Sequence, residues 1–157
     1  QSVGNACSVA VARQAVWLVT DTFQVFFRAG IHDEKIEGRE WMPVAPPSMS
    51  PEYVGAGRVV TDGVSRAWLL GTDGTLYFRR NATEANPLGT RWDQVKGPKF
   101  KDVCVGDGTL WGVDVDDMVH FRAGITKNRP QVSHEHDAER SRRKGKKMKK
   151  TKEEARR

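Results

Sequence analysis

The sequence lacks the features that would place the chain in a membrane or mark its start. No stretch among its 157 residues approaches the roughly 20 consecutive apolar residues that a membrane-spanning helix needs. The N-terminus, Gln1 to Asn5, has no initiator methionine, no basic start and no apolar signal core. We therefore expect the chain to begin inside a longer protein.

Cysteine is scarce, because Cys7 and Cys104 are the two thiols of the whole chain. Two thiols do not build a disulfide framework, and their spacing matches no zinc pattern. Both lie in strand-like apolar stretches, which predicts two small buried hydrophobic residues. Sparse cysteine is typical of a reducing compartment, so the sequence favours a cytoplasmic location, peripheral to intracellular membranes, over the alternative of secretion.

A catalytic constellation is also missing. There is neither a phosphate-binding glycine loop nor a nucleophile elbow. Residues 134–136 read His-Glu-His, but no third ligand follows at zinc spacing. Asp114, Asp116 and Asp117 are not followed by the glycine and distal glutamate of a calcium loop. The sequence thus predicts no enzyme, no cofactor and no metal site.

The net charge of +6 is concentrated at the C-terminal end, since residues 138–157 hold 11 Lys and Arg against three Glu. Such a segment is expected to be disordered or helical. Its candidate residues for binding an anionic surface are Arg142, Arg143, Lys144, Lys146, Lys147, Lys149 and Lys150. Three roles stay open for this segment: it binds anionic lipid headgroups, it binds RNA or an importin, or it only solvates the chain end. Having no aromatic residue to stack a base, it is a poor candidate for sequence-specific nucleic-acid binding.

What the sequence does have is an internal repeat, whose copies are counted from three origin tryptophans. At offset +10 each copy has phenylalanine, and at offset +11 each has arginine. The first two copies also share glycine at +21 and tryptophan at +24. The origins are Trp17, Trp68 and Trp111, and the shared +21 and +24 residues are Gly38, Gly89, Trp41 and Trp92. A fixed pattern of this kind marks a repeat architecture.

The local chemistry of each unit is that of β-strands. Asp73-Gly74 stands between the apolar runs 67–71 and 76–79, which predicts a hairpin because glycine tolerates the positive φ of the turn. Further strand candidates are residues 8–12, 52–61, 91–95 and 103–105. Four short strands in units of 43 to 51 residues favour propeller blades over a helical solenoid or a sandwich.

The recurring aromatic residues are expected to pack between neighbouring blades. This predicted repeat core comprises Trp17, Phe27, Trp41, Trp68, Phe78, Trp92, Trp111 and Phe121. Arg28, Arg79 and Arg122 each follow a phenylalanine, so in an alternating strand they face away from it. They either bond carbonyls of the next blade or hold a ligand or partner, and both roles stay open.

Residues 16–31, 89–95 and 110–126 resemble tectonin repeats, and residues 86–92 resemble the Asn-Pro-x-Gly-x-x-Trp link of that family. The resemblance covers about residues 6–130. It implies β-propellers without catalytic activity, which occur in secreted lectins and in large intracellular proteins of autophagy and vesicle traffic. Copy three departs from the pattern, with Glu135 at offset +24, so its blade is expected to end early or to take its last strand from elsewhere.

The expected organisation is all-β: a partial propeller of about three four-stranded blades over residues 1–132, followed by a basic tail over 133–157. The units are expected at about 6–50, 51–100 and 101–132, with the rest of the ring upstream. The expected function is a non-catalytic scaffold that binds protein partners in vesicle trafficking or autophagy, with membrane contact through the tail. The alternative is a lectin that binds carbohydrate or lipopolysaccharide through the repeat arginines.

Overall fold

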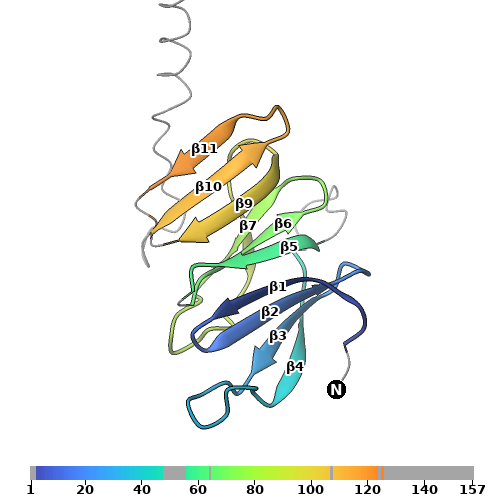
Figure 1. Cartoon of the computed structure of the whole chain (residues 1–157), viewed down its shortest axis with the longest axis vertical. Helices are drawn as coiled ribbons and strands as arrows, with labels where there is room; N and C mark the ends of the chain where they lie inside the picture. Colours follow the sequence, from blue (N-terminus) through green and yellow to red (C-terminus); the bar gives the residue numbers. More distant parts are fainter. Residues whose placement is uncertain (1–2, 48–55, 64, 107, 124, 126–157) are drawn as a thin grey trace, which may run out of the picture.

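Three antiparallel β-sheets follow one another along the chain and stack side by side (Figure 1). The computed structural model describes residues 3–47, 56–63, 65–106, 108–123 and 125, and all the regular structure in these residues is β. Blade 1 has strands β1 (Ala6–Ala12), β2 (Ala15–Thr20), β3 (Val25–Ala29) and β4 (Glu40–Val44). Blade 2 has β5 (Ala56–Thr61), β6 (Ala67–Gly71), β7 (Leu76–Arg79) and β8 (Trp92–Gln94). Blade 3 has β9 (Phe100–Gly106), β10 (Thr109–Asp114) and β11 (Val119–Arg122).

Each blade is a meander in which consecutive strands pair, with the order β1-β2-β3-β4 in blade 1 and β5-β6-β7-β8 in blade 2. The predicted hairpin at residues 72–75 is confirmed, because the N–H of Gly71 donates to the Thr75 carbonyl at 2.8 Å and Gly74 has a φ of +82°. The described part of blade 3 has three strands, in the order β9-β10-β11. The all-β prediction of about three blades is therefore confirmed, while the predicted tail lies outside the described residues.

Side chains on the two faces of blade 2 fill two separate cores, since alternate residues of a strand point to opposite sides. Leu69 and Tyr77 face blade 1 and belong to the core of the first interface, the one between blades 1 and 2. Trp68 and Phe78 face blade 3 and belong to the core of the second interface, the one between blades 2 and 3. Blade 2 is thus covered on both faces, which explains why every residue of β6 and β7 is buried.

The innermost strands also contact one another through polar groups across the first interface. The backbone N–H of Val59 donates to the Ser8 hydroxyl at 3.2 Å, and the Thr61 hydroxyl donates to the Val11 carbonyl at 2.8 Å. The N–H of Arg13 donates to the carbonyl of Gly63 at 2.9 Å. These bonds fix the position of β5 beside β1, so the two blades meet in a defined register.

The prediction that both cysteines are buried is wrong, because Cys7 and Cys104 are both exposed. Cys7 lies at a register irregularity between β1 and β2, and its thiol donates to the carbonyls of Val19 at 3.4 Å and Thr20 at 3.3 Å. Cys104 pairs with Trp111 on the side of blade 3 that points away from blade 2. A strand-like apolar context predicted the strands but not which face each thiol occupies.

Candidate functional site

The centre of the first interface is a stack of two indole rings and one guanidinium group. Trp17 of blade 1 and Trp92 of blade 2 meet edge to face, with ring centroids 5.5 Å apart. The guanidinium carbon of Arg79 lies 5.1 Å from the Trp92 centroid and 5.8 Å from that of Trp17. Both indole N–H groups are buried without an acceptor among the described residues, so ring packing and cation–π attraction hold this stack together.

Arg79 is fixed by its own blade rather than by the next one. Its Nε donates to the Leu88 carbonyl at 2.8 Å, nine residues further along the chain, and the residue is 8% exposed. Burial lowers the pKa of the Arg79 guanidinium from its usual value. The expectation of a bond to a carbonyl of the next blade is therefore corrected for Arg79, and its enclosed position leaves no surface for a ligand.

Arg28 makes the same local contacts in blade 1. Its Nε donates to the Glu37 carbonyl at 2.8 Å, and its guanidinium carbon lies 5.3 Å from the Trp41 ring centroid. A glycine with positive φ follows the accepting carbonyl in both blades: Gly38 at +67° and Gly89 at +65°. This arginine clip, an Nε bonded nine residues ahead and stacked on the +24 tryptophan, is thus a repeated device. In blade 1 the clip is half-buried, because no described element covers that side.

Arg122 differs from the other two repeat arginines. Its Nη2 donates to the carbonyl of Lys96, in the segment that joins blade 2 to blade 3. Its side chain also lies against Gly97, close enough that a Cβ on that glycine would collide with it. Arg122 therefore bonds the preceding segment of chain, and the residue nine positions ahead of it lies outside the described residues.

The burial of the predicted core residues depends on their position in the stack. Trp17, Phe27, Trp68, Phe78 and Trp92 are buried, each 5% exposed or less. Trp41 and Phe121 are half-buried, on the outer sides of the first and last blades. Trp111 is 46% exposed, so the expectation of burial is wrong for it. The physical reason is that the side of blade 3 bearing Trp111 has no described sheet packed against it.

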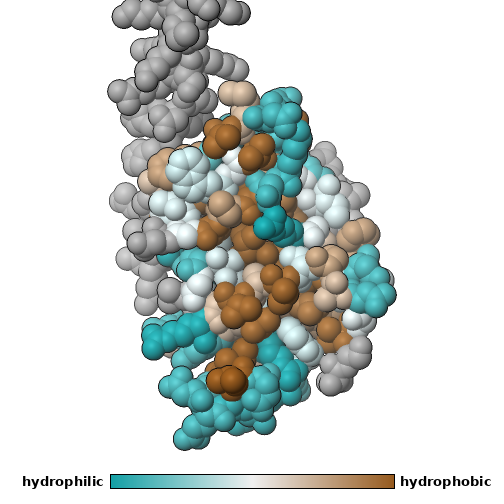
Figure 2. Space-filling model, viewed as in Figure 1, coloured by the Kyte–Doolittle hydropathy of each residue, from teal (hydrophilic) through white to brown (hydrophobic). Residues whose placement is uncertain are grey.

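An open apolar hollow lies beside Trp111. Its lining residues include Cys104, Trp111, Val113 and Val119. Figure 2 shows apolar side chains on the surface over the first and third sheets, among more hydrophilic neighbours. Val119 is 59% exposed at this end, and Val9 and Val11 are 62% and 65% exposed on blade 1. The hollow on blade 3 and the exposed valines on blade 1 are two separate apolar areas, and exposed apolar patches are typical of protein-interaction surfaces.

A second apolar feature lies at the turns that join the second and third strands of each blade, which we call the turn edge. The residue at offset +6 has positive φ in all three turns: Phe23 at +63°, Gly74 at +82° and Asp117 at +64°. Glycine and aspartate suit this conformation, whereas a bulky aromatic residue there is an outlier. Phe23 is 48% exposed, and Val115 and Met118 at the blade 3 turn are 51% and 42% exposed.

Sequence reasoning missed the turn edge, although a signal was present. The repeat alignment places Phe23 at the position that holds Gly74 and Asp117 in the other copies. A residue that contradicts the turn chemistry of its own repeat points to a function other than folding. Phe23 is one of three described non-glycine residues with positive φ and the bulkiest of them, and it marks the turn edge as a candidate binding surface.

Comparisons with known proteins identify the type of repeat. A family model described as Propeller, Hyd_WA, matches residues 68–95, which run from the second residue of β6 through β7 and β8. The human Tectonin beta-propeller repeat-containing protein 2 is 25% identical over 142 residues, covering 87% of this chain and 10% of that protein. The repeats are thus similar to those of tectonin β-propeller proteins.

Solved structures support the same fold. YCF48 from Cyanidioschyzon merolae has a TM-score of 0.52 and 14% identity, over 82% of this chain and 35% of that chain. Human WBSCR16 has a TM-score of 0.56 and 15% identity, over 78% of this chain and 37% of that chain. At such identities these likenesses concern the fold alone. The chain spans about a tenth of its curated relative and about a third of each of these structures.

The second interface of the blade stack is held by ion pairs as well as by apolar side chains. Arg58 of β5 pairs with Asp102 of β9, and Lys99 pairs with Asp73 at the blade 2 turn. Burial by itself raises the pKa of the Asp73 carboxyl, but hydrogen bonds from Lys99 and Thr75 outweigh it and hold that pKa below its usual value. These two ion pairs join blade 2 to blade 3, so each of the charged side chains has its partner within the protein.

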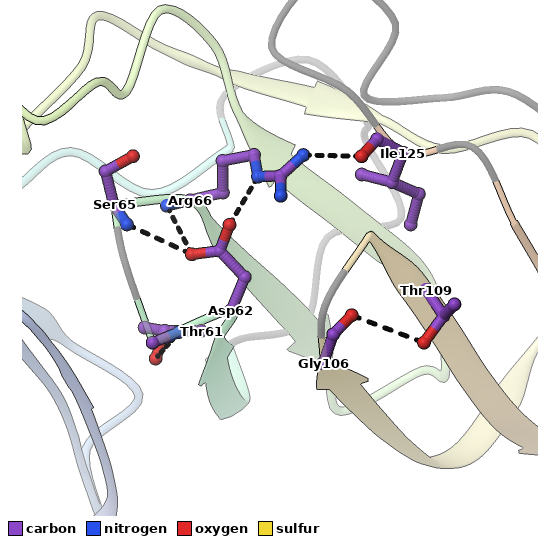
Figure 3. A network of polar contacts seen from close by, with 8 residues as sticks. Thr61, Asp62, Ser65, Arg66, Gly106, Thr109 and Ile125 are labelled. Carbon is purple, nitrogen blue, oxygen red and sulfur yellow. Dashed lines mark hydrogen bonds and ion pairs between the residues drawn. The ribbon is translucent and has the colours of Figure 1, made fainter.

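A further polar network joins the β5–β6 loop of blade 2 to the end of blade 3 (Figure 3). The Asp62 carboxylate accepts the backbone N–H groups of Ser65 at 3.0 Å and Arg66 at 2.9 Å, and it also pairs with the Arg66 side chain. Arg66 Nη1 then donates to the Ile125 carbonyl at 2.7 Å. These contacts all lie within the protein, so the network fastens blade 3 to blade 2.

His120 and Asp114 form the one described pair in which a histidine contacts a carboxylate. Nε2 of His120 lies 2.6 Å from Oδ2 of Asp114, and the Asp114 carboxylate also accepts the N–H groups of Asp116 and Met118. The hydrogen bond from His120 is the largest cause that holds the pKa of Asp114 below its usual value. The pair shapes the blade 3 turn and thereby positions Met118 at the turn edge.

Several predicted features fall outside the described blades or have no counterpart in them. Residues 134–136 and the basic residues from Arg142 to Lys150 lie outside the described residues. Within the described part of the chain, no three His, Cys, Asp or Glu side chains gather in a group that could hold a metal ion. No helix in that same part is long and apolar enough to cross a membrane.

Proposed function

We propose that this tectonin chain is a non-catalytic interaction scaffold of intracellular vesicle traffic or autophagy, whose turn edge binds a partner protein. The observation that carries the proposal is Phe23, an aromatic residue held at a φ of +63° and 48% exposed. A non-glycine residue in this region costs about 1–2 kcal/mol. The turn itself does not require an aromatic residue at this position, since glycine or aspartate occupies it in the other blades.

The chemistry of the turn edge suits a protein partner. Phe23, Val115 and Met118 are large apolar side chains on turns that a rigid sheet positions. Aromatic residues and methionine are enriched at protein interfaces, where a few buried anchors supply most of the binding free energy. Loops displayed on a rigid scaffold are the usual place for such anchors.

The place in vesicle traffic or autophagy rests on the resemblance to intracellular tectonin-repeat proteins. The basic tail fits this role, because each Lys or Arg near an anionic membrane contributes about 1 kcal/mol of attraction. We accordingly propose a cytoplasmic location, peripheral to intracellular membranes. The lectin alternative has lost one of its three arginines, since Arg79 is enclosed between two indole rings. It now depends on Arg28 and Arg122.

The proposal is tested by capturing partners with the full chain and two matched variants. Phe23→Gly removes the aromatic anchor and relieves the backbone conformation, so it should raise the melting temperature while abolishing capture of traffic or autophagy components. Ile36→Ser, at a side chain that is 79% exposed in the β3–β4 loop, should leave capture unchanged. Capture that survives Phe23→Gly would exclude the turn edge, and capture of no such component by the wild-type chain would exclude the proposed role.

A parallel glycan array separates the lectin alternative from the scaffold. The scaffold predicts no glycan binding by the wild-type chain. Glycan or lipopolysaccharide binding that disappears in both Arg28→Ala and Arg122→Ala would replace the scaffold by the lectin.

A further inference from the structure

The turn edge has acidic side chains directly beside its apolar ones. Asp21 lies two residues before Phe23, and Asp116 directly follows Val115. All four residues are exposed. The Asp21 carboxylate accepts a hydrogen bond from the neutral side-chain amide of Asn5 at 3.1 Å, and among the described residues neither carboxylate takes part in an ion pair. Each of these two apolar side chains therefore stands beside a negative charge that the described blades do not neutralise.

The lysines of this edge do not supply the missing positive charge, because most of them have carboxylate partners of their own. Lys99 pairs with Asp73 at the blade 2 turn, and Lys101 pairs with Asp117 at the blade 3 turn, where the two atoms are 2.6 Å apart. Lys96 is the other exposed lysine in the segment that joins blade 2 to blade 3. With two carboxylates outside ion pairs against this one lysine, the described part of the turn edge is negatively charged.

The exposure of these turn positions does not depend on whether a neighbouring blade is present. Blade 2 has a sheet on each side, and yet Thr72 is exposed, although it has the repeat offset of Asp21 and Val115. Met118 is different, since the equivalent Thr75 of blade 2 is 6% exposed. Met118 is therefore left out of the surface considered below.

We propose, on the basis of the function proposed for the turn edge, that its partner binds through a linear segment with both basic and large apolar side chains. The apolar side chains of the segment pack on Phe23 and Val115, while its Lys or Arg side chains pair with Asp21 and Asp116. Buried apolar anchors supply most of the binding free energy, and complementary charges select the partner and speed association. The three turns lie in a row along one side of the stack (Figure 1), so an extended segment can contact more than one of them.

Other occupants match this surface less well. An anionic membrane attracts Lys and Arg but is repelled by carboxylates, so the turn edge is not the side that faces anionic lipid. The basic tail of the chain offers charge without apolar anchors, since residues 138–157 contain two alanines and one methionine beside 11 basic residues. An acidic segment would place like charges together, which opposes binding.

The first test is selection of short random peptides by display on the full 157-residue chain. We expect the selected peptides to be enriched in Lys or Arg together with large apolar residues. One selected peptide is then synthesised as found and with its basic residues changed to glutamate, and fluorescence anisotropy measures the affinity of both forms. The basic form should bind and the glutamate form should not. Selection of acidic or uncharged peptides would overturn the proposal.

The second test assigns the charges with matched variants. Asp21→Asn and Asp116→Asn keep the side-chain shape and should each weaken binding of the basic peptide by about two- to fivefold. Asp33→Asn, at an exposed carboxylate in the β3–β4 loop at the other end of the strands, should leave the affinity unchanged. Asp116→Lys should weaken the basic peptide further and let the glutamate form bind. All variants should keep the wild-type melting temperature.

The variants also separate this inference from the function on which it rests. Affinity that falls in Phe23→Gly but not in Asp21→Asn or Asp116→Asn would overturn the basic partner and leave the turn edge as the binding surface. Peptide binding that survives Phe23→Gly would overturn both proposals. Wild-type binding to anionic vesicles that is lost in Phe23→Gly would replace the protein segment by a membrane.

The tail is tested as a competing occupant in the same assay. Its lysines are neutralised together in a variant that combines Lys146→Gln, Lys147→Gln, Lys149→Gln and Lys150→Gln. We expect this variant to bind the basic peptide as the wild type does. Tighter peptide binding by the variant would mean that the tail occupies the turn edge of its own chain, and would overturn the proposal of a separate partner.

Discussion

The two interfaces inside the blade stack each bury an origin tryptophan, but different residues surround it. The first is centred on aromatic rings, with Arg79 held between Trp17 and Trp92. In the second, Trp68 packs against Leu110 and Ile125 of blade 3, and ion pairs cross between the blades. In sequence, copy three has Glu135 where the other copies have the +24 tryptophan, at a position outside the described residues.

This difference shows which part of the repeat is general and which part is replaceable. The origin tryptophan is buried in both interfaces, so it is the common element. The arginine clip is present in blades 1 and 2, and Arg122 of blade 3 bonds the joining segment. A blade without its +24 tryptophan can still dock, provided that other apolar residues and ion pairs cover the tryptophan of the preceding blade.

The largest contrast is expected between Trp17 and Trp111, which share a repeat position but differ in burial. Trp17→Ala should lower the free energy of unfolding by about 3–5 kcal/mol, because it removes a buried indole and leaves a cavity in the first interface. Trp111→Ala should lower the free energy of unfolding by less than about 1 kcal/mol, because the Trp111 ring is 46% exposed. Urea denaturation of both variants measures the difference, and equal losses would contradict the account.

A smaller effect is expected at the glycine that shapes the arginine clip. A Cβ on Gly89 would lie 2.6 Å from the Arg80 carbonyl oxygen at a φ of +65°, so both contact and conformation oppose a side chain. Gly89→Ala should destabilise the protein by about 2 kcal/mol or more.

Gly63→Ala is the matched control for this prediction. Gly63 also has positive φ, at +79°, but a Cβ there would meet nothing within 4 Å. Gly63→Ala should therefore lower the free energy of unfolding by about 1 kcal/mol, which is the cost of the backbone conformation without a steric clash. Thermal melts of the two variants that give the same loss would show that the close approach of Gly89 to the clip is unimportant.

The smallest effect is expected from acid, and it should fall mainly on the second interface. The folded pKa of Asp73 lies below its unfolded value of about 3.9, so its ionised form stabilises the fold. That contribution is complete above about pH 5 and disappears as the pH falls through the folded pKa. Asp114, lowered chiefly by its hydrogen bond with His120, adds to the same acid dependence.

The acid dependence is measured from unfolding midpoints between about pH 7 and pH 2. Asp73→Asn should flatten the curve at the acid end and lower stability near neutral pH. A variant curve parallel to that of the wild type would mean that the bridge between Lys99 and Asp73 contributes nothing to the second interface.

The strands and the repeat could be predicted from sequence because both depend on local patterns. Alternating apolar residues and the Asp73-Gly74 turn fix the hairpin of β6 and β7 without reference to the rest of the chain. The offsets of tryptophan, phenylalanine and arginine repeat in the sequence itself. The fold class followed from these two signals.

Burial at the ends of the stack could not be predicted in this way. Trp17 and Trp111 are the same residue at the same offset, and only the presence or absence of a neighbouring sheet separates 0% from 46% exposure. The arginine clip also could not be predicted from sequence, because its acceptor carbonyl belongs to a loop of the same blade and not to a strand of the next blade. The strained turn at Phe23, in contrast, was visible in the alignment of the copies and was overlooked.

The central claim is that an origin tryptophan and the arginine clip of the next blade act together to join two blades. A double-mutant cycle with Trp17→Phe, Arg79→Met and the combined variant tests it most directly, by urea denaturation of all four chains. Direct contact predicts a coupling free energy of about 0.5–3 kcal/mol between the two positions. If the two losses simply add, the ring and the guanidinium act independently, and the stack is not what joins the blades.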